Sequence, residues 1–164
     1  MSKIHQLKAR EIIDSRAKPT LEVELVLSGG FKGRASVPSG ASTGIHEALE
    51  LRDNDTARFN GKGVLKAVEK AGEIFSQIKD KEFSSQEDLD NFLIILDGTD
   101  NKSNLGANTI LAISMAYAQA NALKNDKKLF EYIGESFGNS YYKMPVPIFN
   151  VWNGGRHANW ATDV

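Results

Sequence analysis

The residues best suited to chemistry form one short loop of small and polar side chains. Residues 37–44 read Val-Pro-Ser-Gly-Ala-Ser-Thr-Gly. The glycines allow backbone N–H groups to converge on an anion, and the hydroxyl oxygens are ligands that a hard cation accepts. Small polar residues before a helix more often form an ordinary cap or turn. Two interpretations therefore stay open: an ion-binding loop, or a loop whose Ser39 hydroxyl caps a helix near His46.

The elements that must position this loop are strands before it and helices after it. Apolar residues alternate with mostly charged ones over 21–27 and again over 31–37. This period of two predicts a β-hairpin that turns at Ser28-Gly29-Gly30 and runs directly into the loop. A further strand is predicted over 4–13, and Lys18-Pro19 is expected to lie outside any regular ladder. The sum is a three-stranded antiparallel meander.

Beyond residue 46 the apolar residues recur every three or four positions, which predicts amphipathic helices. The first predicted helix covers 64–78. The second begins at a capping box formed by Ser84 and Glu87, and it ends at Gly98. In each of these two segments the apolar residues fall on one side of the predicted helix, which indicates one buried face.

Two more helices and a final strand are predicted towards the end of the sequence. The alanine-rich stretch 105–123 is apolar around most of its circumference, so it is expected to be buried on several sides. A shorter helix covers 128–133 and ends at Gly134, and an apolar run over 145–152 reads as a strand with no partner after it. Strands followed by helices predict an α+β domain whose helical bundle packs on one face of the meander.

Length and composition exclude several classes of protein. The chain has 164 residues, 41% of them hydrophobic, which suits one ordinary domain with its own core. Its 20 basic and 21 acidic residues give a net charge of −1, so neither nucleic acid nor a membrane surface is an expected partner. The absence of cysteine excludes disulfides and thiolate metal sites. No secretory signal or membrane-spanning run is present, and we expect a cytoplasmic protein.

Five segments carry a family resemblance: 11–20, 46–53 (His-Glu-Ala-Leu-Glu-Leu-Arg-Asp), 61–64, 96–108 and 145–158, the last containing Asn-Gly-Gly-Arg-His-Ala. In one collinear order they resemble enolase, the lyase that interconverts 2-phosphoglycerate and phosphoenolpyruvate. The resemblance implies an enolase N-terminal-like α+β domain over 1–138. It also implies that 139–164 form a linker and the first strand and loop of an incomplete (β/α) barrel.

The resemblance assigns roles to residues of the loops. Ser39 matches the family serine whose oxygens bind the second of two Mg²⁺ ions when the loop closes, so it is the expected metal ligand. Substrate contacts are expected from Ala41, Gly155 and His157, and the histidine is expected near the substrate phosphate. The movable lid loop consists of Ser39, Gly40, Ala41, Ser42 and Thr43. The base, the acid and the ligands of the first Mg²⁺ come from the barrel in this family, so no catalytic residue is expected within this chain.

The resemblance further implies a homodimer or higher homo-oligomer, with Arg16 and Glu22 in the region of the subunit contact. The family usually has glycine and asparagine where this chain has Ala17 and Lys18, a difference expected to affect the turn before Pro19.

Other residues are expected to have no part in a site. His5 and His46 match no catalytic position and are expected to be structural or exposed. The acidic run over 53–55 lacks the ligand pattern of a calcium loop, so a solvated turn is expected there.

Three hypotheses for function remain. In the first, the sequence belongs to an enolase, and the 164-residue chain alone is inactive and binds little or no Mg²⁺. The alternative is a non-catalytic dimerisation or interaction module that keeps the enolase N-terminal fold. The weakest is an independent phosphate-binding domain, because the loop lacks the lysine and the βαβ context of a P-loop.

Overall fold

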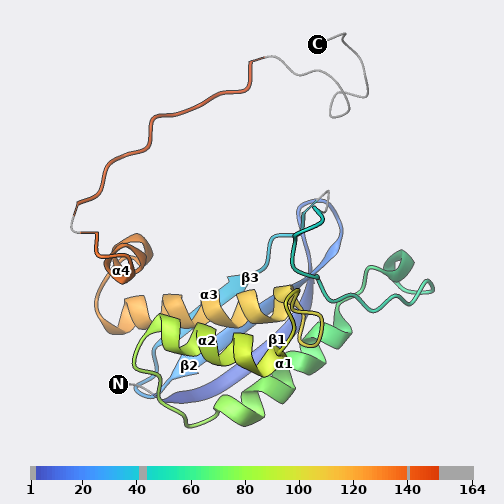
Figure 1. The fold of residues 1–164 in the computed structure, drawn as a ribbon, viewed down its shortest axis with the longest axis horizontal. Helices are drawn as coiled ribbons and strands as arrows, with labels where there is room; N and C mark the ends of the chain where they lie inside the picture. Colours follow the sequence, from blue (N-terminus) through green and yellow to red (C-terminus); the bar gives the residue numbers. More distant parts are fainter. Residues whose placement is uncertain (1–2, 41–43, 140, 152–164) are drawn as a thin grey trace.

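The computed structural model describes residues 3–40, 44–139 and 141–151, and it consists of a small sheet covered by helices (Figure 1). The strands are β1 (Ile4–Ile13), β2 (Pro19–Leu27) and β3 (Lys32–Ser36). A 3₁₀ turn, η1 (Phe59–Gly61), precedes the helices α1 (Leu65–Ile78), α2 (Gln86–Asp97), α3 (Ala107–Lys124) and α4 (Leu129–Ser136). The predicted α+β class is confirmed.

The strands form the predicted antiparallel meander, in the order β1-β2-β3. The turn between β2 and β3 contains Gly29 at φ 96° and Gly30 at φ 87°, backbone angles that favour glycine. One expectation is wrong, because Pro19 does not leave the ladder but opens β2 opposite Ile13. The first position of a strand tolerates proline, since the missing N–H is not needed there.

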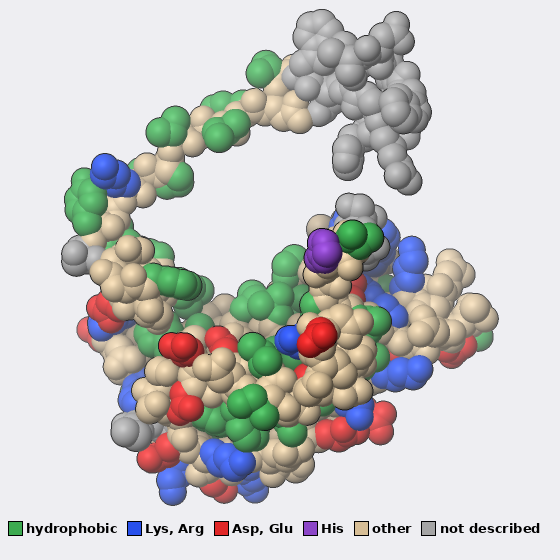
Figure 2. Space-filling model, viewed as in Figure 1, with side chains coloured by type: hydrophobic (Ala, Val, Ile, Leu, Met, Phe, Trp, Pro, Cys, Tyr) green, Lys and Arg blue, Asp and Glu red, His purple; other side chains and the backbone are tan. Residues whose placement is uncertain are grey.

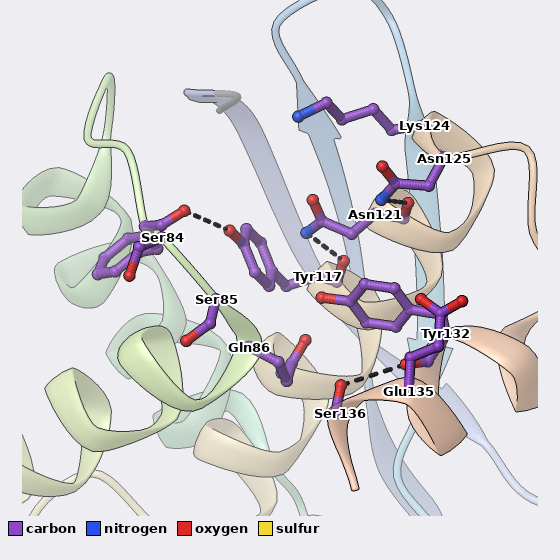
Figure 3. Close-up of a pocket in the computed structure, with 11 residues that line it drawn as sticks. Ser84, Ser85, Gln86, Tyr117, Asn121, Lys124, Asn125, Tyr132, Glu135 and Ser136 are labelled. Carbon is purple, nitrogen blue, oxygen red and sulfur yellow. Dashed lines mark hydrogen bonds between the residues drawn. The ribbon is translucent and has the colours of Figure 1, made fainter. Parts of the chain in front are cut away.

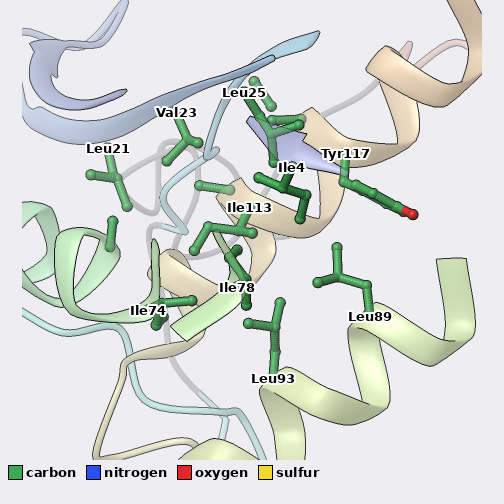
Figure 4. Packing of buried hydrophobic residues seen from close by; sticks show 14 of the residues in the cluster. Ile4, Leu21, Val23, Leu25, Ile74, Ile78, Leu89, Leu93, Ile113 and Tyr117 are labelled. Atoms are coloured by element: carbon green, nitrogen blue, oxygen red, sulfur yellow. The ribbon is translucent and has the colours of Figure 1, made fainter. Parts of the chain in front are cut away.

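Helices α1, α2 and α3 lie over one face of the sheet, and the core lies between the two layers (Figures 1 and 4). The inward side chains of β2 are fully buried, and apolar residues of α1, α2 and α3 converge on them. Members of this core include Leu21, Leu25, Ile74, Leu89, Leu93 and Ile113. Burying one aliphatic side chain of this size contributes about 1.5–3 kcal/mol, so this layer is the main source of stability.

α3 lies so close to β3 that one strand position admits only glycine. A Cβ atom at Gly33 would lie 1.9 Å from the carbonyl oxygen of Ala116 and 2.6 Å from the backbone nitrogen of Ala120. Both are backbone atoms of α3, so they cannot move aside without shifting the helix. The contact sets the position of β3, and with it the start of the loop that follows.

The opposite face of the sheet carries charged residues. Glu22 lies between two arginines: Arg10 Nη1 donates to Glu22 Oε1 at 2.7 Å, and Arg34 Nε is 3.8 Å from Glu22 Oε2. Glu22 therefore has ion-pair partners on both neighbouring strands of its own chain.

None of the described helices combines the length and the apolar composition that crossing a bilayer requires.

α2 begins one residue later than predicted. The predicted cap was Ser84, whereas the Ser85 hydroxyl accepts a hydrogen bond from the Asp88 backbone N–H at 3.1 Å. Asp88 in turn accepts from the Ser84 backbone N–H at 3.0 Å. Ser84 and Ser85 are each followed by an acidic residue three positions later, Glu87 and Asp88. The sequence alone therefore could not show which serine caps the helix. The predicted end at Gly98 is confirmed, with φ 69°.

The last two helices differ from prediction at their ends. α3 begins at Ala107 because Gly106, with φ 87°, cannot continue a helix. α4 continues past Gly134 to Ser136. Gly134 is buried, and a Cβ there would lie 2.4 Å from Cε1 of Tyr142. This glycine is therefore a packing residue and does not end the helix.

Residues 141–151 form an extended segment that leads away from α4, with apolar side chains along its length (Figures 1 and 2). The predicted strand over 145–152 is wrong for its described part, because 145–151 contain no strand. A strand needs a neighbour to satisfy its backbone groups, and no described strand lies beside this segment. Its side chains are exposed, Val146 by 84% and Ile148 by 95%.

Candidate functional site at the Ser39 loop

Ser39 contacts three charged residues, and we call the group of Arg16, Ser39, Glu50 and Arg52 the Ser39 corner. Arg52 Nη2 donates to the Ser39 hydroxyl at 3.0 Å, and that hydroxyl donates to Glu50 Oε2 at 3.4 Å. Arg16 Nη2 donates to the Ser39 carbonyl oxygen. Both oxygens of the half-buried Ser39 therefore accept from a guanidinium.

The strands hold the loop just before Ser39. The Val37 backbone N–H donates to the Leu21 carbonyl at 2.9 Å, and the Thr20 hydroxyl donates to the Val37 carbonyl at 2.6 Å. Thr20 and Val37 are both buried. Pro38 then interrupts the ladder because it has no N–H to donate. Ser39 therefore starts the loop from a fixed point.

Arg52 ties the corner to two distant parts of the backbone. Its Nη1 donates to the carbonyls of Pro19 and Lys62, each at 2.7 Å, and its Nη2 also donates to Glu50 Oε1 at 2.6 Å. The side chain is 17% exposed. A planar guanidinium with acceptors on both terminal nitrogens has little freedom to move, so Arg52 holds a defined orientation.

The segment around Leu51 is bound to the start of α3. Asn108, 3% exposed, donates to the Leu51 carbonyl and accepts from the Leu51 N–H, both at 3.0 Å. The Ala107 N–H donates to the Leu49 carbonyl at 2.8 Å. In an extended segment, residues on either side of one position share the opposite face. Fixing Leu51 in this way directs Glu50 and Arg52 towards Ser39.

A buried carboxylate organises the connection from α2 to α3 that supports this segment. Asp97, 1% exposed, accepts from the Leu105 N–H at 2.7 Å and from the N–H and hydroxyl of Thr99. Burial acts to raise the pKa of Asp97, but these hydrogen bonds outweigh it and the pKa is lowered. The Asn101 carbonyl in the same connection accepts from the Leu49 N–H at 2.7 Å. The motif over 96–108 therefore positions the corner.

A second arginine–carboxylate group lies at the start of α1, and we call Glu11, Asp53 and Arg58 the cap cluster. Glu11 Oε2 accepts from the Val64 backbone N–H at 2.7 Å, and Asp53 Oδ1 accepts from the Lys66 backbone N–H at 2.8 Å. Arg58 forms ion pairs with both carboxylates. Acidic groups at this end satisfy free N–H donors and complement the helix dipole, so the cluster caps α1.

The cap cluster corrects one expectation. A solvated turn was expected over 53–55, but the Asp53 side chain is only 9% exposed and bonds to α1. Asp53 caps a helix that begins 12 positions later in the chain, at Leu65. No pattern among the residues next to Asp53 could therefore reveal that it is a helix cap.

A pocket of about 390 Å³ opens beside the Ser39 corner and is lined by residues that include Gly40, Glu47, Glu50 and Arg52. The hydroxyl, carbonyl and carboxylate oxygens at this place are the ligand types that Mg²⁺ prefers. No group of three or more histidine, aspartate or glutamate residues that could hold a metal occurs in the described ranges. The corner therefore offers at most part of the ligand set of a Mg²⁺ ion, and both Ser39 oxygens accept hydrogen bonds from arginines.

The structure describes two of the predicted site residues: Ser39 belongs to the Ser39 corner, and Gly40 lines the pocket beside it. The other predicted residues lie outside the described ranges: Ala41, Ser42, Thr43, Gly155 and His157. The interpretation of Ser39 as a helix cap is wrong, because residues 44–58 contain no helix. His5 and His46 are exposed, as expected.

Sequence reasoning missed the residues that surround Ser39. Glu50 and Arg52 were quoted only as part of a family motif, and Asn108 was given no role. The alternation of charged Glu50 and Arg52 with apolar Leu51 was a usable signal for an extended segment with one charged face. The sequence could not show that this charged face contacts Ser39, because Ser39 lies on a different segment of the chain.

Another pocket, of about 380 Å³, lies between the start of α2, α3 and α4 (Figure 3). Tyr117 and Tyr132 point into it, and burial raises the pKa of Tyr132 to about 12. Glu135 on its rim pairs with Lys127 at 2.5 Å. A phenol with a raised pKa stays neutral near pH 7 and is a poor base, and no predicted site residue lines this pocket.

The chain resembles known proteins over almost its whole length. The family model for the N-terminal domain of enolase matches residues 4–133. Two relatives named Enolase 2, from Pseudomonas syringae pv. tomato and Pseudomonas syringae pv. syringae, are each 52% identical over 160 residues. These matches cover 97% of this chain and 37% of each relative, so the chain spans little more than a third of their length. It belongs to the enolase family, and the sheet and helices described above are the N-terminal domain of that family.

Proposed function

We propose that the protein containing this chain is a glycolytic enolase, a carbon–oxygen lyase that converts 2-phosphoglycerate to phosphoenolpyruvate and water. The observation that carries this proposal is the 52% identity, over 160 residues, to two relatives named Enolase 2. The oxygen-rich Ser39 corner beside a pocket of about 390 Å³ agrees with it.

In this proposal Ser39 contributes its hydroxyl and carbonyl oxygens to the second of two Mg²⁺ ions. Bound Mg²⁺ supplies positive charge that stabilises the negative charge developing on the substrate as its proton is removed. Arg52 and Glu50 hold the Ser39 end of the loop, so the ligand starts from a defined position. Gly40, Ala41, Ser42 and Thr43 complete the lid, and Ala41, Gly155 and His157 contact the substrate.

We also propose a domain boundary near residue 138, with 139–164 as linker and first strand and loop of a barrel. α4 ends at Ser136, and the exposed apolar side chains over 144–151 need further strands to cover them. The base, the acid and the first metal site belong to that barrel. The 164-residue chain alone is therefore proposed to be inactive, and the whole enzyme to be a homodimer or higher homo-oligomer with Arg16 and Glu22 near the subunit contact.

The test is an assay of the longer protein for phosphoenolpyruvate formation over a range of Mg²⁺ concentrations. Ser39→Ala is expected to raise the Mg²⁺ concentration for half-maximal rate about tenfold or more, because it removes a ligand. The control is Ser36→Ala, since the Ser36 hydroxyl contacts Glu22 on the opposite face of the sheet. An unchanged Mg²⁺ dependence in Ser39→Ala would count against the metal role, and no product from the wild type would refute the activity.

A further inference from the structure

Both Ser39 oxygens that the proposed function assigns to a metal accept hydrogen bonds from arginines. Arg16 Nη2 donates to the carbonyl oxygen, and Arg52 Nη2 donates to the hydroxyl at 3.0 Å. A guanidinium carries a full positive charge and has no acceptor of its own. It therefore competes with a divalent cation for the same lone pairs and also repels that cation.

The two arginines differ in how firmly they are held. Arg52 is 17% exposed, and it donates to the carbonyls of Pro19 and Lys62 as well as to the corner. Arg16 is 45% exposed, and among the described residues its other side-chain contact is long, with Nε 3.9 Å from Asp14 Oδ2. Arg16 can therefore turn out into solvent at little cost, whereas moving Arg52 would break bonds to the start of β2 and to the backbone that follows η1.

We propose that Arg16 is a displaceable substitute for the metal, which holds the Ser39 carbonyl in the metal-free chain and leaves when a divalent cation binds there. The inference rests on the proposed function, because that function assigns the Ser39 carbonyl to Mg²⁺. Arg52 stays in place, and the Ser39 hydroxyl turns away from it. The arrangement keeps the start of the loop ordered before the cation arrives.

A measurable consequence is that Arg16 weakens cation binding. Only chains whose Ser39 carbonyl is released can accept the ion, so the apparent affinity falls in proportion to that fraction. Arg16→Gln removes the charge and most of the hydrogen-bonding capacity, and it should increase the fraction of chains that are ready to bind. Arg16→Lys keeps the charge without the planar fork, and it should give an intermediate result.

The test follows amide signals of the ¹⁵N-labelled 164-residue chain during titration with Mn²⁺, a paramagnetic substitute for Mg²⁺. The titration extends to millimolar Mn²⁺, because the chain alone is expected to bind the cation only weakly. In Arg16→Gln, half-maximal broadening of the Gly40 amide is expected at a Mn²⁺ concentration about threefold lower than in the wild type. The matched control is Arg34→Gln, which loses the same charge from a side chain that is 63% exposed on the other face of the sheet. It should leave that concentration almost unchanged.

An equal shift in the two variants would mean that only net charge matters, and it would overturn the proposal. A higher Mn²⁺ requirement in Arg16→Gln would also overturn it, because Arg16 would then assist binding. Absence of broadening at the Gly40 amide in the wild type and in every variant would also overturn the proposal, because no cation would then bind at Ser39. Failure of the proposed function would appear separately, as absence of phosphoenolpyruvate formation by the longer protein with Arg16 intact.

Discussion

The segment between β3 and α1 is held by arginines at both ends, but the two ends differ in what the arginines hold. At the cap cluster, Arg58 pairs with Glu11 and Asp53, whose oxygens also accept backbone N–H groups of α1. At the Ser39 corner, Arg52 holds a hydroxyl beside a pocket of about 390 Å³. Arginine and carboxylate side chains serve stability at the cap cluster, where each carboxylate also accepts backbone N–H groups. They can serve binding at the Ser39 corner, where an oxygen can exchange its partner.

Packing around the two groups reinforces the difference. A Cβ atom at Gly63 would lie 2.3 Å from Asp53 Oδ2 and 2.7 Å from Arg58 Nη1, so the cap cluster is closed even to a methyl group. Gly40, by contrast, lines the pocket at the corner. A ligand therefore has space beside the corner, whereas the cap cluster leaves no space at Gly63.

The largest expected effect is from Glu11→Ala at the cap cluster. The free energy of unfolding should fall by about 2–3 kcal/mol, because the Val64 N–H and Arg58 lose an acceptor in a partly buried place. Urea denaturation followed by circular dichroism measures this change. Glu50→Ala at the Ser39 corner is the matched variant and should cost less than about 1 kcal/mol, since Glu50 pairs with Arg52 near solvent. Equal losses would break the comparison.

Acid should weaken the cap cluster in a defined range of pH. Hydrogen bonds from Arg58, above all, lower the pKa of Glu11 below its ordinary value of 4.5. The ionised carboxylate therefore contributes stability above pH 4.5, and this contribution is lost as the pH falls below that value. Glu11→Gln should be less stable than the wild type at neutral pH and should lose stability less steeply in acid. Stability curves of the same shape for both chains would contradict this assignment.

The smallest expected effect concerns the turn that carries Arg16. Ala17 has φ 57°, a left-handed backbone angle that costs a residue with a Cβ about 1–2 kcal/mol. Ala17→Gly should raise the free energy of unfolding by about 0.5–1 kcal/mol, because greater freedom of the unfolded chain offsets part of the relief. Ala57→Gly, in a turn without a positive φ, should instead lower it slightly. If thermal unfolding shows that Ala17→Gly is less stable than the wild type, the proposed backbone strain at Ala17 would be refuted.

Much of the fold was predictable, because its signals are local. The alternation over 21–27 and the glycines at 29 and 30 predicted a hairpin that the structure confirms. One error concerns a position whose behaviour depends on a residue outside its own helix. Gly134 was expected to end a helix, but it stays inside α4 because the ring of Tyr142 packs against it.

The candidate site was predictable only in part. The resemblance to enolase singled out Ser39, and Ser39 does lie at a polar corner beside a pocket. Asn108 was missed, although it fixes Leu51 and through it Glu50 and Arg52. Asn108 follows Leu51 by 57 positions in the chain, so no periodic pattern links them.

The sequence by itself determined the family and the α+β class and singled out the loop proposed to offer ligands, because these depend on residue types and on spacings within one element. Only the tertiary structure decided which charged side chains meet Ser39 and which cap α1. Arg16, Glu50 and Arg52 come together because two strands and the start of α3 bring separate segments to one point. Electrostatic and hydrogen-bonding partners are set by distance in space, and a linear pattern does not contain that distance.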